Sequence, residues 1–238
     1  MAYKLRLKFN KYAHMIYIGH LDLMRYFQKA MRRAGVDISY TSGFSPHQIM
    51  SFAQPLGVGV FSNGEYVDIS VESLTSSRQL VKALSGVMAE GVDILSARLL
   101  PEDARGAMAS IAAASYTVSF RTGSEPGFDL AQALTDFYNR DSILIEKETK
   151  KGSRQVDLKE HIYALSHDAG ENTVYMLLDA SSGGNIKPNL VMETLYDFAD
   201  ARLGEFDLIV TREDIFAEDH DASGQRRFIS LNDIGKDY

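Results

Sequence analysis

The chain has 238 residues, 45% apolar and 24% charged, which is typical of a soluble globular protein with one large or two small domains. It has no cysteine, which excludes disulfides, thiolate zinc sites, cysteine nucleophiles and a cysteine-held iron–sulfur cluster in this chain. The N-terminus lacks the continuous apolar segment of a signal peptide, and no run of about 18 apolar residues occurs, so we expect a cytoplasmic protein without membrane contact.

The net charge of −7 is unevenly distributed along the chain. Residues 1–50 contain eight basic and two acidic residues, a local charge of +6, whereas the other 188 residues carry −13. A basic region on an otherwise acidic protein is typical of a localised anion-binding surface. Two differently charged solvated faces would explain the same numbers, so the charge alone leaves both interpretations open.

Apolar and basic residues alternate strictly over residues 3–9, which is the period of a half-buried strand. One face of this strand is apolar, and the other carries Lys4, Arg6 and Lys8 at intervals of about 7 Å. We expect these three cations to lie on an open face, with a spacing similar to that of nucleic-acid phosphates. Residues 14–18 could continue this strand or pair with it.

From residue 20 the apolar period becomes that of a helix, which we expect to end at Gly35 as its C′ residue. The spacing of Arg25, Lys29 and Arg32 is i, i+4 and i+7, so these side chains share one face of the helix. The sequence therefore predicts a second cationic surface, on this helix.

The cations of this helix also have simpler explanations. Lys and Arg in the later turns, such as Arg32 and Arg33, complement the helix dipole without any ligand. Arg25 can form an i,i+3 ion pair with Asp22, worth about 0.2–0.5 kcal/mol on an exposed face. The sequence does not choose between these roles and anion binding.

Residues 41–47 contain Ser-Gly and Ser-Pro steps and predict a loop that carries Phe44 and His47. A phenylalanine in such a loop is either an anchor that packs inward or a platform for base stacking. Phe44 is therefore one candidate stacking residue. Tyr66, on the predicted strand 65–71, is the other.

The first hundred residues follow the order strand, helix, strand, strand, helix, strand, which is the split βαβ or ferredoxin-like order. The expected elements are strands at 3–9, 36–40, 65–71 and 92–99, an edge strand within 49–60, and helices at 20–34 and 80–88. The order repeats later, with strands at 116–121, 142–148, 173–178 and 207–211 and helices at 129–138 and from Pro188 onward.

We therefore predict an α+β protein with two tandem ferredoxin-like halves and antiparallel sheets. The first half is 1–100, with the basic surface, and the second is 115–212. Residues 101–114 form a connector, and residues 213–238 are expected as a polar tail that extends or docks loosely.

The chain resembles the bacterial radical-SAM-associated proteins of unknown function through four motifs: Gly19–Arg25, Arg32–Gly35, Ser42–His47 and Ser51–Ala53. Such proteins occur beside a cobalamin-binding-type radical SAM protein as a separate chain, or as its C-terminal extension. The resemblance covers residues 1–72 well and the rest in general character, including 184–189. It departs at Gly19, where the family usually has serine.

The resemblance implies a partner, the cobalamin-binding-type radical SAM protein, more than an activity. Since this chain has no cysteine for a cluster, it would be an accessory or substrate-presenting subunit. The family also tends to lie near genes for ribosomal proteins and an RNA-processing nuclease, which implies RNA, either tRNA or rRNA, as the substrate class.

The first functional hypothesis is a noncatalytic RNA-binding accessory subunit of a radical SAM enzyme. Its candidate RNA- or anion-binding residues are Lys4, Arg6, Lys8, Arg25, Lys29, Arg32, Arg33, Phe44, His47 and Tyr66.

Two alternatives belong to other functional classes. A metal-independent RNA-processing or RNA-modifying enzyme would use His20 and His47, with Asp22, for acid–base chemistry. A protein–protein interaction module would bind no nucleic acid. His14 together with these three residues could also ligate a metal, but the spacing matches no known signature, and we expect neither a metal nor a cofactor.

Overall fold

The structure of the chain, a computed structural model, describes residues 2–149 and 152–238. The chain divides into two compact units, of which unit 1 comprises Met1–Ala112 and Asp214–Tyr238 and unit 2 comprises Ala113–Glu213. The halves expected at 1–100 and 115–212 fall within these units. Across the described ranges, no helix combines the length and the apolar character needed to cross a bilayer.

Unit 1 contains β1 (Tyr3–Lys11), η1 (Ala13–Tyr17), α1 (His20–Arg33), β2 (Met50–Phe52), β3 (Phe61–Val71), α2 (Ser77–Ser85), β4 (Ile94–Leu99), α3 (Ala107–Ser110), β11 (Arg226–Ser230) and η3 (Leu231–Asp233). Unit 2 contains α4 (Leu130–Tyr138), β6 (Leu144–Thr149), β7 (Gly152–Asp157), η2 (Leu158–His161), β8 (Ile162–Asp168), β9 (Thr173–Asp179) and α5 (Pro188–Phe198). Strands β5 (Ile111–Phe120) and β10 (Leu208–His220) cross the boundary between the units.

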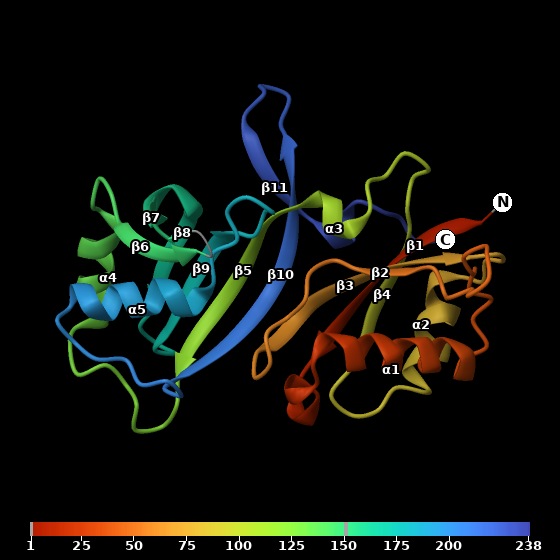
Figure 1. The fold of residues 1–238 in the computed structure, drawn as a ribbon, viewed down its shortest axis with the longest axis horizontal. Coiled ribbons are helices and arrows are strands. Elements are labelled where there is room, and N and C mark those ends of the chain that lie inside the picture. Colours follow the sequence, from red (N-terminus) through yellow and green to blue (C-terminus); the bar gives the residue numbers. More distant parts are fainter. Residues whose placement is uncertain (1, 150–151) are drawn as a thin grey trace. The chain divides into compact units, whose positions relative to one another are not determined.

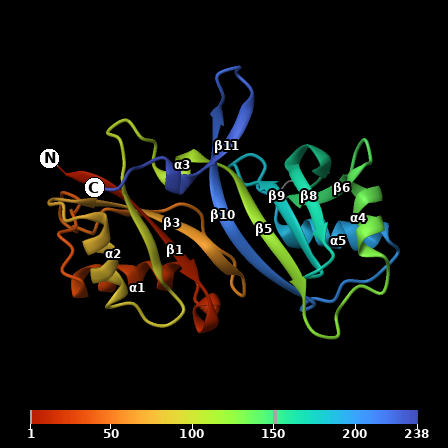
Figure 2. The ribbon, with the colours of Figure 1, turned by 180° about the vertical axis from the view of Figure 1, so that it is seen from behind.

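In unit 1, the strands lie in the order β4–β1–β3, and β2 pairs with β3. The described pairs are antiparallel, so that Leu5 of β1 lies opposite Ile69 of β3 and Leu99 of β4. Helices α1 and α2 lie on one face of these strands (Figures 1 and 2). The alternation predicted for the first strand is confirmed, because Leu5, Leu7 and Phe9 are all buried in the core under the two helices.

Helix α1 confirms the helix predicted from the apolar period. Leu23, Phe27 and Met31 recur every four residues and are buried, and the Phe27 ring lies 4.8 Å from that of Phe9. Burying each such side chain contributes about 1.5–3 kcal/mol. The helix ends where predicted, because Gly35 takes a left-handed φ of 67° that favours glycine.

Two short strands expected in unit 1 are absent from the structure. The segment 14–18 lies largely in the 3-10 helix η1, which ends at Tyr17, and the buried Lys11 ammonium donates to the carbonyl oxygens of Ile16 and Ile18. The segment 36–40 forms isolated bridges at Ile38 and Tyr40 and no continuous strand.

Of residues 213–238, expected as a polar tail, all but Glu213 belong to unit 1, and they contribute ordered elements to it. Strand β11 pairs with β10, with Ala217 opposite Ile229, and η3 follows directly. Near the C-terminus, Lys236 and Leu99 exchange backbone hydrogen bonds of 2.8 and 3.1 Å. The apolar side chains of this segment pack with those of α3 and β3 in a second cluster of buried residues: Ala53, Tyr66, Ala107, Ile215, Ala217 and Leu231.

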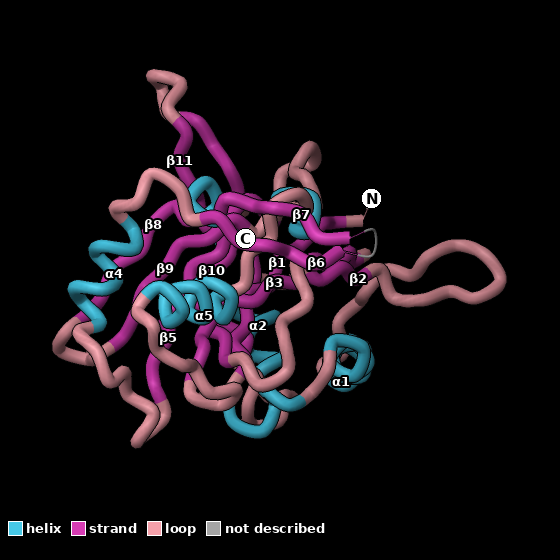
Figure 3. Tube along the Cα trace, turned by 60° about the vertical axis from the view of Figure 1, so that its left-hand side comes forward, coloured by secondary structure: helices cyan, strands magenta, loops and turns pink. Residues whose placement is uncertain are grey.

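In unit 2, the strands lie in the order β10–β5–β9–β8, and β9 is antiparallel to both of its neighbours. Helices α4 and α5 lie side by side (Figures 1 and 3). Pro188 opens α5 as predicted. Strands β6 and β7 form a separate two-stranded sheet. The strand pairs β1–β3, β1–β4, β2–β3, β10–β11, β5–β9, β8–β9 and β6–β7 are antiparallel, so the prediction of an α+β protein is confirmed, with a mostly antiparallel sheet.

Candidate anion-binding surface

Arg6 lies on the face of β1 that we expected to be open, and its side chain is fully buried. Its Nε and Nη2 atoms donate to the two carboxylate oxygens of Asp68 at 2.7 and 3.0 Å. Nη1 donates to the carbonyl oxygen of Leu231, and Nη2 also to that of Arg105, each at 3.3 Å. Asp68 in turn accepts from the backbone N–H of Ala107 at 2.7 Å. Arg6 is therefore a structural residue, with its charge neutralised inside unit 1.

Lys8 is half-buried on the same face and forms an ion pair with Asp214 at 3.2 Å. The Tyr66 hydroxyl donates to Asp214 at 2.5 Å and lies 3.1 Å from the Ser230 hydroxyl. Burial, followed by the negative charge of Asp214 and this hydrogen bond, raises the pKa of Tyr66 far above its usual value. Since the Tyr66 ring is only 1% exposed and lies 5.6 Å from the Lys8 ammonium, its faces are not available to a base.

Residues after Asp214, together with α3, thus cover the face of β1 that the sequence predicted to be open. Of the three cations on this face, Lys4 alone is exposed, with its ammonium 3.5 Å from the carbonyl oxygen of Glu102. The expectation of an open row of cations along β1 is corrected, because Arg6 and Lys8 are held by Asp68 and Asp214.

The cations of α1 lie in a different environment, since Arg25, Lys29 and Arg32 are all exposed. The predicted i,i+3 pair is confirmed, with Arg25 and Asp22 3.1 Å apart and both side chains 68% exposed. Such a pair contributes little to stability and leaves the guanidinium accessible to an anion. Arg33 is exposed as well, but it donates to the carbonyl oxygen of Val87 at 3.1 Å.

The loop at residues 41–47 is closed at its base by two hydrogen bonds between Thr41 and His47. The Thr41 N–H donates to the His47 carbonyl oxygen at 2.9 Å, and the His47 N–H donates to the Thr41 hydroxyl at 3.1 Å. Gly43 adopts a φ of 112°, which a side chain would disfavour, and this turn precedes Phe44. Phe44 is fully exposed, so it is not an inward-packed anchor.

Gln48 holds the base of this loop against α1. Its buried side-chain amide donates to the carbonyl oxygen of Gln28, in the middle of α1, at 3.2 Å. The base of the Phe44 loop is therefore tied by Gln48 to α1, the helix that carries the exposed Arg25, Lys29 and Arg32. Sequence reasoning missed Gln48, since a single glutamine after a loop carries no periodic signal.

The proposed acid–base residues do not form a common cluster. Within the ranges that the structure describes, no hydrogen bond, ion pair or ring contact joins His20, Asp22 and His47. His20 is the first residue of α1 and packs edge-on against Phe52 at 5.4 Å, whereas Asp22 pairs with Arg25. His47 is exposed and lies 3.1 Å from the Thr41 hydroxyl. The same ranges contain no group of three or more His, Asp or Glu side chains that could hold a metal ion.

Comparison of the chain with known protein families gives one match. The family described as "Uncharacterized protein conserved in bacteria (DUF2344)" matches residues 4–188 of the 238-residue chain. This range includes all of α1, the Phe44 loop and most of unit 2. No curated protein matches the chain. The chain therefore belongs to this family of bacterial proteins.

Proposed function

We propose that the protein is a noncatalytic RNA-binding subunit that presents an RNA to a partner enzyme. The observation that carries this proposal is that Gln48 ties the base of the exposed Phe44 loop to α1, the helix that carries the exposed cations. Arg25, Lys29 and Arg32 would neutralise phosphates, and Phe44 would stack on an unpaired base. Single-stranded RNA is the best match, because its bases are accessible to an aromatic side chain.

We further propose a cobalamin-binding-type radical SAM protein as the partner enzyme. The resemblance of the α1 and loop motifs to radical-SAM-associated proteins supports this partner. The absence of cysteine from the sequence supports the accessory role, since the cluster must then be held by another chain. Copurification of the two tagged proteins tests the association, and a failure to copurify at low salt would contradict it.

We also propose that each unit is a ferredoxin-like module. The order β4–β1–β3–β2 in unit 1 supports this proposal, because it is the sheet order of the split βαβ arrangement. Unit 2 offers the equivalent order β10–β5–β9–β8, with the β6–β7 hairpin as an insertion. Backbone contacts measured by NMR would test both orders.

RNA binding is tested by fluorescence anisotropy of a labelled 20-nucleotide polyuridine between 50 and 300 mM KCl. We expect the affinity to fall with salt by a logarithmic slope of about −0.7 for each phosphate contacted. A Lys29→Gln, Arg32→Gln double variant should reduce the magnitude of this slope by about 1.4. The matched control is Arg78→Gln, Lys82→Gln, which removes two exposed cations spaced i,i+4 on α2.

The aromatic contribution is tested separately with Phe44→Ala. Loss of one stacked base should weaken the free energy of RNA binding by about 1–3 kcal/mol. The salt dependence of the affinity should stay unchanged, because no phosphate contact is lost. Binding that is absent at 50 mM KCl, or that does not depend on salt, would contradict the RNA-binding proposal. So would equal effects of the α1 and α2 double variants.

A further inference from the structure

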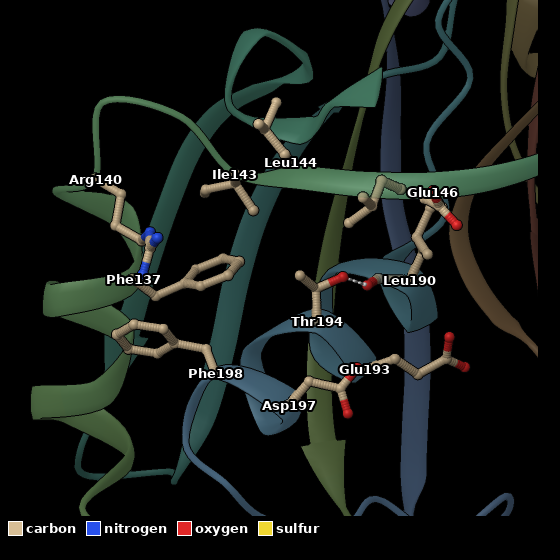
Figure 4. A pocket seen from close by; sticks show the side chains of 11 residues that line it. Phe137, Arg140, Ile143, Leu144, Glu146, Leu190, Glu193, Thr194, Asp197 and Phe198 are labelled. Carbon is tan, nitrogen blue, oxygen red and sulfur yellow. Dashed lines mark hydrogen bonds between the residues drawn. The ribbon is translucent and has the colours of Figure 1, made fainter. Parts of the chain in front are cut away.

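Unit 2 contains a groove of about 500 Å³ between α4, α5 and β6, far along the chain from the α1 surface. Its floor is apolar, and Figure 4 shows the rings of Phe137 from α4 and Phe198 from α5 lying next to one another. The two ring centroids are 5.8 Å apart. Leu190 of α5 and Ile143, just before β6, extend the apolar lining. The volume lies in the range that binds small molecules or the side chains of a peptide.

Part of this apolar lining is accessible to solvent. The Leu144 side chain at the rim is 56% exposed, and Phe198 is 39% exposed. Exposed apolar side chains that line a concave surface, unlike single ones scattered on a convex surface, mark sites that bind a partner. The groove therefore offers apolar contacts that unit 2 itself leaves uncovered.

The rim of the groove is acidic. Glu146, Glu193 and Asp197 line it, and none of the three forms an ion pair with another residue whose side chain the structure describes. Arg140 is the basic residue of the lining, and its guanidinium lies 5.4 Å from the centre of the Phe198 ring. Three carboxylates and one guanidinium give the lining a net charge of −2. Such a rim repels phosphates and attracts cations.

We propose that this groove binds a segment of a partner protein that joins an apolar anchor to flanking lysine or arginine residues. The anchor would lie against the accessible apolar surface of Leu144, Leu190 and Phe198, and the flanking cations would pair with Glu193 and Asp197. This is the charge and apolar complement of the groove. The inference goes beyond the proposed RNA binding and does not depend on it, because it concerns other residues in the other unit.

The experiment selects a phage-displayed library of random 12-residue peptides on the full chain. We expect enriched peptides to combine leucine, phenylalanine or methionine with lysine or arginine. The most enriched peptide is then synthesised with a fluorescent label, and its binding to variants is measured by anisotropy. Leu144→Ser should weaken binding about tenfold, and Glu193→Lys, Asp197→Lys should weaken it more than tenfold.

The matched control is Glu171→Lys, Glu205→Lys, which reverses two exposed acidic residues of unit 2 outside the groove. The affinity of this control variant for the peptide should stay within twofold of the affinity of the original protein. A loss equal to that of the groove variant would show non-specific charge attraction and overturn the proposal. Enrichment of acidic or purely polar peptides, or of no peptide, would overturn it as well.

Discussion

Two sets of cations in unit 1 have the same chemistry and opposite environments. Arg6 on β1 is fully buried and held by Asp68 in a two-point ion pair, whereas Arg25 on α1 is exposed and pairs with Asp22 through one contact. The difference arises from what covers each face. A segment more than 200 residues later in the chain, with the carbonyl oxygen of Leu231, closes over Arg6, whereas no described residue outside α1 forms a comparable contact with Arg25.

This comparison shows that a basic pattern identifies a face but not its exposure. Strict alternation correctly placed Arg6 on the face opposite Leu5 and Leu7. A buried charge must be paired and hydrogen-bonded, and Asp68 with two backbone carbonyl groups meets this requirement. The same residue type therefore stabilises the fold on β1 and remains accessible on α1.

The largest expected effect that sharpens this contrast is that of Asp68→Ala. The substitution leaves the Arg6 guanidinium buried without a counter-ion and should reduce the free energy of unfolding by about 3–5 kcal/mol. The control is Asp22→Ala, which removes the exposed partner of Arg25 and should cost at most about 1 kcal/mol. Urea unfolding monitored by circular dichroism measures both. Similar losses in the two variants would contradict the structural role of the Arg6–Asp68 pair.

A pH-dependent effect is expected next, from Tyr66. Its pKa is raised in the folded protein above its ordinary value of 10, so its contribution to stability is fully present below pH 10 and is lost as pH rises above it. One such group makes the free energy of unfolding fall by about 1.4 kcal/mol per pH unit in this range. Tyr66→Phe should therefore show a shallower loss of stability between pH 10 and 11 in urea titrations. An unchanged slope of stability against pH would mean that the Tyr66 hydroxyl is not buried beside Asp214.

The smallest stability effects are expected on the α1 surface. Lys29→Gln, Arg32→Gln and Phe44→Ala each remove exposed groups and should change the free energy of unfolding by no more than about 0.5 kcal/mol. Thermal unfolding checks this expectation and also validates these variants for the RNA-binding measurements. A loss above about 1.5 kcal/mol in any of them would show that the α1 surface, like β1, has a structural role.

The candidate site was only partly predictable from the sequence. The spacing of Arg25, Lys29 and Arg32 was sufficient to place them on one helix face, because helical geometry is local. The exposure of Phe44 was left open, since a loop phenylalanine can pack either way. The contact between Gln48 and Gln28 depends on how the loop folds back onto α1, and no local pattern encodes it.

The α1 helix, the alternation of β1, the order of the main strands along the chain and the absence of cysteine chemistry are predictable from the sequence alone. Each of these follows from composition or from a period of two to four residues. Which basic face is open depends on tertiary contacts. That outcome depends on contacts between Arg6, Tyr66 and the C-terminal residues Asp214 and Leu231, which are separated by at least 148 positions in the chain. Such contacts form because the folded chain buries apolar groups and pairs the polar groups that it buries. Because they join residues far apart in the chain, no local sequence pattern predicts them.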